Sequence, residues 1–294
     1  MPDLKNSLRE SLSINLLLPL SRLQRLIRPS RRAVIRAYYE GMLFRRRATG
    51  WTSEQKLDWI LQRLRFAARR AYRETDYYRA LFDQIGFDPE SDFHFDEFSR
   101  IPALEREDVR DAGRSLLSRA MATGEMLKDS TGGSTGAPTE VWLGPEERGW
   151  KESAGEYFMR RMGAPTGART ALLWGHHLDP QAQDTLRDRL HAYETNSRYF
   201  DCLRLSPDTL EAYHREFEQW RPSCIIAYAS ALGHLAEHVL ERGYRPTYPS
   251  RCFVTGAEKL LPAHREAIER AFGRPVHERY GGRDVGYIAF QMEP

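Results

Sequence analysis

The stretch DSTGGSTGAPTEVWLG, residues 129–144, has the residue types best suited to chemistry. Glycine can take a positive φ and lets backbone N–H groups approach a ligand, and successive N–H groups in such a bend form a concave site for anions. Serine and threonine hydroxyls add neutral donors for phosphate oxygens. The glycines are Gly132, Gly133 and Gly136, and the hydroxyls belong to Ser130, Thr131, Ser134 and Thr135.

Two well-known nucleotide-binding patterns do not fit this stretch. Counted from Gly132, the pattern GxxxxGK[ST] requires a glycine where Ala137 stands and a lysine where Pro138 stands. The pattern GxGxxG is not present either. Because clusters of glycine, serine and threonine are common in ordinary loops, the residues alone leave two interpretations open, a polar turn and a phosphate-binding loop.

The cysteines and histidines form no recognisable catalytic or metal-binding pattern. Cys202, Cys224 and Cys252 lack CxxC spacing, which favours a reducing, cytoplasmic environment over a disulfide scaffold or a zinc site. His176 and His177 are adjacent, so their side chains point apart on any regular element. We expect these two histidines at the rim of a pocket at most.

The elements that would position such residues change character along the chain. From about residue 126, short strand-like runs alternate with helical runs, which predicts an α/β fold with a mostly parallel sheet flanked by helices. The predicted strands are 139–144, 168–174, 198–203, 224–230, 251–258 and 275–282, and the predicted helices are 146–161, 181–191, 206–220, 230–242 and 261–273. Ligands of such sheets bind beyond the carboxyl ends of the strands, so the loops that follow the strands are the candidate site.

Residues 1–100 are predicted to be mainly helical and basic, and residues 101–294 to form the α/β nucleotide-binding part of one continuous domain. Thr52 followed by Gln55 predicts a capping box at the start of a helix. Residues 1–79 contain 18 lysines and arginines against 7 aspartates and glutamates, a net charge of +11. The basic stretch 22–47 fits a docking surface for anionic lipid, nucleic acid or an acidic partner, and it also fits a solvated helix face.

Several classes of protein are not expected. No apolar run approaches the ~20 residues that span a bilayer. The run SINLLLPL, residues 13–20, is short, ends at a proline and lacks a small-residue cleavage site, so a signal peptide is not predicted. We expect a cytoplasmic protein with no nucleic-acid partner, and a homodimer is one candidate assembly.

Three motifs in sequence order resemble those of the adenylate-forming superfamily, in particular its phenylacetate–CoA ligase-like and CapK-like members. The stretch from Thr131 to Pro138 resembles the phosphate loop, VTGAEKL (254–260) the Gly-Ala-Glu segment, and RYGGRDVG (279–286) the Tyr-Gly-x-x-Glu segment. The stretches 68–87, 98–110 and 172–177 are also similar, so the resemblance runs from about residue 65 to the end. The sequence departs from the family at Thr139, where a lysine is usual, and at Asp284, where glutamate is usual.

The resemblance implies ATP-dependent activation of a carboxylic acid as an acyl-adenylate, followed by transfer to coenzyme A or to another thiol or amine. It implies catalytic roles for Thr135 and Asp284, with Asp284 also holding Mg²⁺. It implies nucleotide contacts from Thr131, Gly132, Gly133, Ser134, Thr135, Gly136, Gly256, Ala257, Glu258, Tyr280 and Gly281. It implies an acid pocket that includes Trp174, Gly175, His176, Tyr228, Ser230 and Gly282.

Each of these roles has a structural alternative. Asp284 can pair with Arg283 or cap a turn, and Tyr280 can be a core tyrosine. Glu258 can be a glutamate stabilised by a helix N-terminus. Core packing can also explain the pocket residues.

The family usually continues past the third motif with a ribose-binding aspartate, a hinge and a small lobe that carries a lysine. The sequence has no counterpart of this lobe, so the resemblance implies an incomplete, large-lobe form: a fragment, one half of a split system with a C-terminal lobe or partner chain, or a naturally short member. The alternative is a non-catalytic binding or scaffold protein with a degenerate site and a basic N-terminal interaction surface.

Overall fold

The fold comes from a computed structural model that describes residues 29–121, 126–130, 140–175, 192–282 and 284–292. The chain divides into a helical unit, Ser30–Trp150, and a sheet unit, which takes in Lys151–Pro294. The division lies within helix α8 (Pro145–Arg161). In the part of the chain that the structure describes, no helix is both long and apolar enough for a membrane span.

The helical unit is built from helices with well-defined ends. Thr52 and Gln55 form the predicted capping box at the start of α4. Thr75 accepts a hydrogen bond from the N–H of Tyr78 at the start of α5, and Gly86 ends α5 with φ 66°. The elements are α3 (Pro29–Ala48), α4 (Ser53–Glu74), α5 (Asp76–Ile85), α6 (Phe95–Phe98), α7 (Arg106–Ala112), η2 (Gly113–Leu116), β1 (Leu127–Ser130) and β2 (Glu140–Leu143), followed by the start of α8.

The strands β1 and β2 form an antiparallel pair, with Leu127 opposite Leu143. The sequence predicted β2 but not β1, because the residues of β1, LKDS, have no alternating apolar pattern and become a strand only by pairing with β2. The stretch 131–139 connects the two strands and lies outside the described residues.

The sheet unit contains the predicted parallel sheet, with strand order β4-β3-β5-β6-β7-β8. All neighbouring pairs are parallel except β7 and β8, which form a hairpin. The strands are β3 (Thr170–Trp174), β4 (Ser197–Asp201), β5 (Cys224–Tyr228), β6 (Cys252–Gly256), β7 (Val276–Gly282) and β8 (Gly286–Phe290), and the helices are α10 (Pro207–Trp220), α11 (Ala229–Glu241) and α12 (Pro262–Phe272). The predicted α/β class is therefore confirmed, whereas the predicted helix at 181–191 lies outside the described residues.

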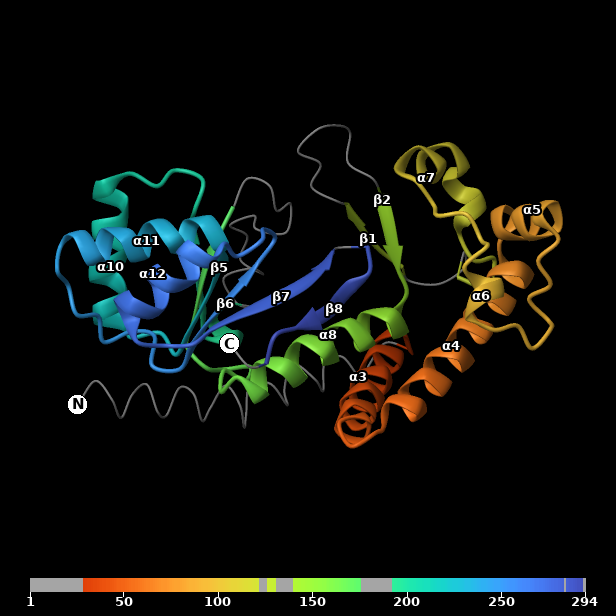
Figure 1. Ribbon diagram of the computed structural model, residues 1–294, viewed down its shortest axis with the longest axis horizontal. Coiled ribbons are helices and arrows are strands. Elements are labelled where there is room, and N and C mark those ends of the chain that lie inside the picture. The colour runs from red at the N-terminus through yellow and green to blue at the C-terminus, as the bar shows by residue number, and fades with distance from the viewer. Residues whose placement is uncertain (1–28, 122–125, 131–139, 176–191, 283, 293–294) are drawn as a thin grey trace. The chain divides into compact units, whose positions relative to one another are not determined.

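Apolar residues alternate between the two faces of the sheet because successive strand side chains point to opposite sides. Ile225 of β5 and Phe253 of β6 pack against α10, α11 and α12, which lie on one side of the strands (Figure 1). Cys224 and Val254 pack against the other face, together with Phe158 of α8. Both faces are covered, which is why β5 and β6 are buried along almost their whole length.

The helices of the sheet unit begin and end where the sequence predicts. The hydroxyl of Ser206 accepts a hydrogen bond from the N–H of Thr209, and Pro207 occupies the first helical position of α10. Pro262 opens α12, and Gly273 closes it with φ 59°. These local signals fix where the helices begin and end. Strands β4, β5 and β6 each end shortly before a helix, and their carboxyl ends form the edge of the sheet where a site can lie.

Candidate functional site at the carboxyl edge of the sheet

The ends of strands β3, β5 and β6 bring several predicted site residues side by side. Tyr228 pairs with Gly256 in the register of β5 and β6, and Leu173 pairs with Ala227 in that of β3 and β5. Trp174 ends β3 one residue later, so it lies at the same edge. Parallel pairing therefore gathers residues that are far apart in the sequence at the carboxyl edge of one sheet.

Trp174 and Tyr228 form one aromatic wall at this edge. Their ring centroids are 4.3 Å apart with an interplanar angle of 58°. A Cβ atom at Gly175 would lie 3.5 Å from the Tyr228 hydroxyl and 3.3 Å from Leu203. The small residue at position 175 therefore allows the chain to turn closely over the tyrosine. Both aromatic rings are only partly buried, so they present apolar surface to a ligand.

Arg279 is a site residue that sequence reasoning missed. Its guanidinium carbon lies 5.1 Å from the centroid of the Trp174 ring and 5.7 Å from that of Tyr287, within the range of cation–π contacts. A Cβ atom at Gly256 would lie 2.9 Å from the Arg279 Nε atom, so glycine leaves room for this side chain. The only signal in the sequence was its place directly before Tyr280.

The residue after Gly256 has an unusual backbone conformation. Ala257 has φ 66°, in the left-handed region that favours glycine. Residues held in this region are found at turns and functional sites, where the surrounding structure overrides the local cost. The strained turn directs the next residue, Glu258, towards the start of helix α11.

Glu258 binds the N-terminus of α11. Its Oε2 atom accepts a hydrogen bond from the Ser230 N–H at 2.9 Å and another from the Ser230 hydroxyl at 2.7 Å. The N-cap residue of α11, Tyr228, makes no side-chain capping bond. Glu258 therefore caps α11 from a separate loop. The sequence alternative, a glutamate stabilised by a helix N-terminus, describes this contact, but the helix is α11 and not the one that follows Glu258. This contact joins two predicted site residues, Glu258 and Ser230.

The remaining predicted residues of the third motif lie on the hairpin of β7 and β8. Tyr280 is 69% exposed, which removes the alternative of a core tyrosine. A Cβ atom at Gly281 would lie 2.1 Å from the carbonyl oxygen of Gly286 on β8, so the pairing itself requires glycine here. A Cβ atom at Gly282 would lie 2.4 Å from an Asp284 carboxylate oxygen. Tyr280 and Asp284 are both exposed, and Asp284 lies in the turn of the hairpin.

The thiol nearest to this edge is Cys202. Its N–H donates to the carbonyl of Trp174 at 3.2 Å, which places it beside the aromatic wall. Burial, aided by the charge of Asp201, raises the pKa of the Cys202 thiol to about 11. The side chain is therefore a protonated thiol at neutral pH and not a ready nucleophile. Cys224 and Cys252 face each other across β5 and β6 with their Sγ atoms 3.8 Å apart, and all three cysteines are free thiols.

Other predictions lie outside the described residues. These are Thr131, Gly132, Gly133, Ser134, Thr135 and Gly136 of the glycine-rich stretch, together with His176 and Arg283. Among the residues that are described, no group of three or more histidine, cysteine, aspartate or glutamate side chains could hold a metal ion. A single carboxylate such as Asp284 is nevertheless a fitting Mg²⁺ ligand in a nucleotide site, because Mg²⁺ takes most of its other ligands from phosphates and water.

The arrangement of the chain matches solved structures of adenylate-forming enzymes. A crystal structure of 2-hydroxyisobutyryl-CoA ligase in complex with 2-HIB-AMP and CoA aligns with a TM-score of 0.60 and 21% identity, over 77% of this chain and 49% of that one. A second crystal structure of this ligase, in an open conformation, aligns with a TM-score of 0.59. The matched part of the chain therefore has the fold of an adenylate-forming enzyme.

No protein-family model matches the chain, but two curated proteins are similar to it in sequence. Protein CapK of Staphylococcus aureus is 19% identical over 186 residues, which cover 63% of this chain and 41% of CapK. The phenylacetate-coenzyme A ligase of Thermus thermophilus is 26% identical over 225 residues, which cover 76% of this chain and 49% of the ligase. The chain is therefore similar in sequence to CapK and to a phenylacetate-coenzyme A ligase, and it spans about half the length of these relatives or less.

Proposed function

We propose that the chain binds ATP and a carboxylic acid at the carboxyl edge of its sheet and takes part in forming an acyl-adenylate. The observation that carries this proposal is the convergence of Trp174, Tyr228, Gly256 and Glu258 on one strand edge. The sequence relation to an acid–CoA ligase supports the same reaction class. Coenzyme A is the acceptor that this relation favours.

The described residues have distinct parts in this proposal. The wall of Trp174 and Tyr228 would hold the apolar portion of the acid, because small-molecule pockets are lined mainly by aromatic and other apolar side chains. Tyr280 would stack on the adenine, since its aromatic ring is exposed. Arg279 would supply positive charge near the reacting carboxylate and phosphate.

Charge stabilisation is the main requirement of the reaction, because negative charge spreads over phosphate oxygens as the carboxylate attacks. The glycine-rich stretch that contains Thr135 would donate N–H and hydroxyl groups to the β- and γ-phosphates. Asp284 would hold Mg²⁺, which when bound neutralises part of the phosphate charge. In this assignment Asp284 needs no second protein carboxylate, because phosphates and water supply the other Mg²⁺ ligands.

Calorimetric titration of the purified chain with ATP and MgCl₂ tests the binding step directly. We expect binding to wild type, and at least tenfold weaker binding after Tyr280→Ala or Asp284→Asn. Tyr199→Ala is the matched control, since Tyr199 is a similarly exposed tyrosine on β4, away from the hairpin. An affinity unchanged in both site variants would refute the assigned roles.

Acid-dependent exchange of labelled pyrophosphate into ATP tests the chemical step, with and without an added C-terminal lobe from a relative. We expect exchange that depends on an added aromatic or aliphatic acid and on Tyr280. Absence of both ATP binding and exchange, together with salt-sensitive binding of the chain to anionic vesicles, would favour the non-catalytic alternative.

A further inference from the structure

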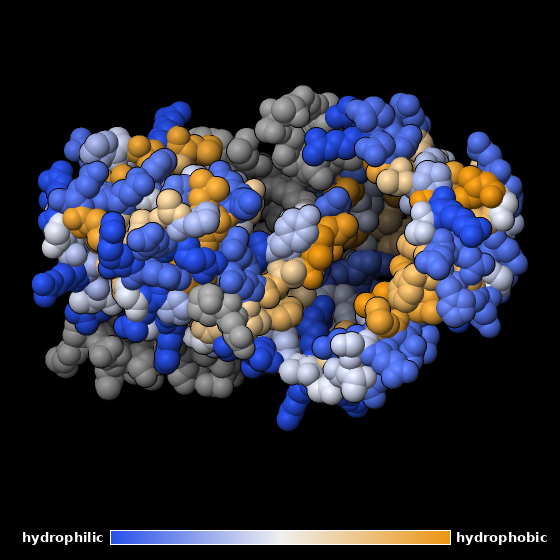
Figure 2. All heavy atoms as spheres, in the orientation of Figure 1, coloured by the Kyte–Doolittle hydropathy of each residue, from blue (hydrophilic) through white to orange (hydrophobic). Residues whose placement is uncertain are grey.

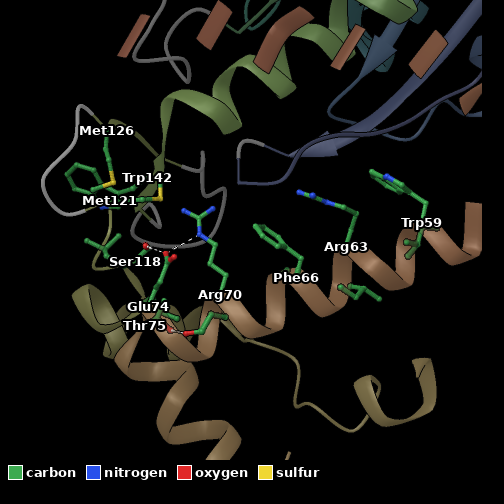
Figure 3. Close-up of a pocket in the computed structure, with 16 residues that line it drawn as sticks. Trp59, Arg63, Phe66, Arg70, Glu74, Thr75, Ser118, Met121, Met126 and Trp142 are labelled. Carbon is green, nitrogen blue, oxygen red and sulfur yellow. Dashed lines mark hydrogen bonds and ion pairs between the residues drawn. The ribbon is translucent and has the colours of Figure 1, made fainter. Parts of the chain in front are cut away.

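A large open groove lies within the helical unit, and the proposed function uses none of the residues that line it. Its volume is about 590 Å³, which is in the range of small-molecule sites. Helix α4 forms one wall, and β2, η2 and the residues beside them form the other (Figure 3). The groove is lined by Trp59, Ile60, Arg63, Leu64, Phe66, Ala67, Arg70, Ala71, Glu74, Thr75, Leu116, Leu117, Ser118, Met121, Met126 and Trp142.

Several large apolar side chains in the groove are exposed to solvent. Phe66 is 52% exposed, Ile60 41% and Trp142 40%. Apolar side chains gather along α4 on the surface of the unit (Figure 2). Met121 and Met126 complete the far wall, and methionine adapts readily to irregular apolar ligands (Figure 3). An apolar ligand would remove this surface from water.

The charges of the groove leave one cation available to a ligand. Glu74 is already engaged, because Arg70 donates to it at 3.0 Å and the Ser118 hydroxyl also donates to it. Arg63 projects from α4 between Trp59 and Phe66, with its guanidinium carbon 4.8 Å from the Phe66 ring centroid (Figure 3). No carboxylate among the described residues forms an ion pair with Arg63. The lining therefore has a net positive charge. Its cation without a described carboxylate partner, Arg63, lies beside Phe66.

We propose that this groove binds a medium-chain fatty carboxylate, with the alkyl chain along Phe66, Met126 and Trp142 and the carboxylate on Arg63. The apolar walls match an alkyl chain, and the cation matches its anionic end. A guanidinium that also stacks on an aromatic ring is pre-organised to pair with a carboxylate. This site is independent of the acid pocket proposed at the edge of the sheet.

Calorimetric titration with decanoate and octanoate, at concentrations below micelle formation, tests the proposal. Each methylene buried in the groove adds up to about fourfold in affinity, so decanoate should bind up to about 15-fold more tightly than octanoate. Arg63→Gln should weaken decanoate binding roughly three- to fivefold, as is typical for an exposed ion pair. Arg73→Gln is the matched control, because Arg73 is on α4 but pairs with Glu90 outside the groove.

A blocking variant locates the ligand. Ala67 lies in the groove and is exposed, so Ala67→Trp fills the groove without disturbing the core. We expect this change to weaken decanoate binding at least tenfold, whereas Ala80→Trp, at an exposed alanine of α5, leaves it unchanged. Circular dichroism melts verify that both variants fold.

Three outcomes would overturn the proposal. The first is no decanoate binding by wild type. The second is decanoate binding that neither Ala67→Trp nor Arg63→Gln weakens, which would place the ligand elsewhere, including in the proposed acid pocket. The third is self-association of the chain that Ala67→Trp removes without any decanoate binding, which would assign the groove to a second copy. Failure of ATP binding would leave this test unaffected.

Discussion

Replacing Glu258 with alanine should separate the structural role of this residue from its proposed role in nucleotide binding. The substitution removes both hydrogen bonds to Ser230 and the negative charge at the N-terminus of α11. A helix cap contributes typically about 1 kcal/mol, and a charge near the helix end adds 0.3–1 kcal/mol. Because Glu258 is exposed and Ser230 is only partly buried, we expect a loss of roughly 1–1.5 kcal/mol of unfolding free energy.

Two further variants separate the contribution of the charge from that of the hydroxyl hydrogen bond. Glu258→Gln keeps an oxygen acceptor but loses the charge, so it should cost roughly half as much as Glu258→Ala. Ser230→Ala keeps the backbone donor and loses only the hydroxyl, so we expect about 0.5 kcal/mol. Urea denaturation followed by circular dichroism gives these values, provided that the m-value stays constant. Glu237→Ala, at an exposed glutamate in α11, is the matched control and should change stability little.

The same variants are then titrated with ATP and MgCl₂. If Glu258 also contacts the adenine, Glu258→Ala weakens ATP binding more than Ser230→Ala does. Lost stability with unchanged ATP affinity would show that Glu258 only caps α11. Full retention of stability in Glu258→Ala would refute the capping argument itself.

Three further predictions concern the hairpin, a thiol and a buried network. Gly281→Ala should destabilise the protein by about 1–3 kcal/mol in thermal melts, because its Cβ would lie 2.1 Å from the Gly286 carbonyl oxygen; an unchanged melt would contradict the observed pairing. Cys202 should react slowly with iodoacetamide at pH 7 and faster as the pH approaches its pKa of about 11, as measured by mass spectrometry; rapid labelling at pH 7 would contradict its burial. The hydrogen bond from His238 lowers the pKa of Glu211, so the stability that this carboxylate contributes is present above the usual glutamate pKa and lost as pH falls through its lowered pKa. Glu211→Gln should therefore be less stable than wild type at pH 7, with the difference vanishing in acid; a difference that persists in acid would contradict this linkage.

Local chemistry made much of the fold predictable. The capping box at Thr52, the proline at position 207 and the closing Gly273 act within a few residues, and each helix end lies where these signals predict. The alternation of strand-like and helical runs predicted a mostly parallel sheet, and β5 and β6 are buried in it because helices cover both of its faces. The sequence did not predict strand β1, because its residues have no alternating apolar pattern and form a strand only by pairing with β2.

The sequence by itself determined the residue types available at the candidate site, the order of its motifs and the strand ends that carry them. Only the tertiary structure decided which side chains meet there. It placed Arg279 against Trp174 and made Glu258 the cap of a helix from which it is well separated in sequence. Helix ends depend on neighbours a few residues apart, whereas these contacts depend on strand register and sheet twist, which bring together residues that no local pattern relates.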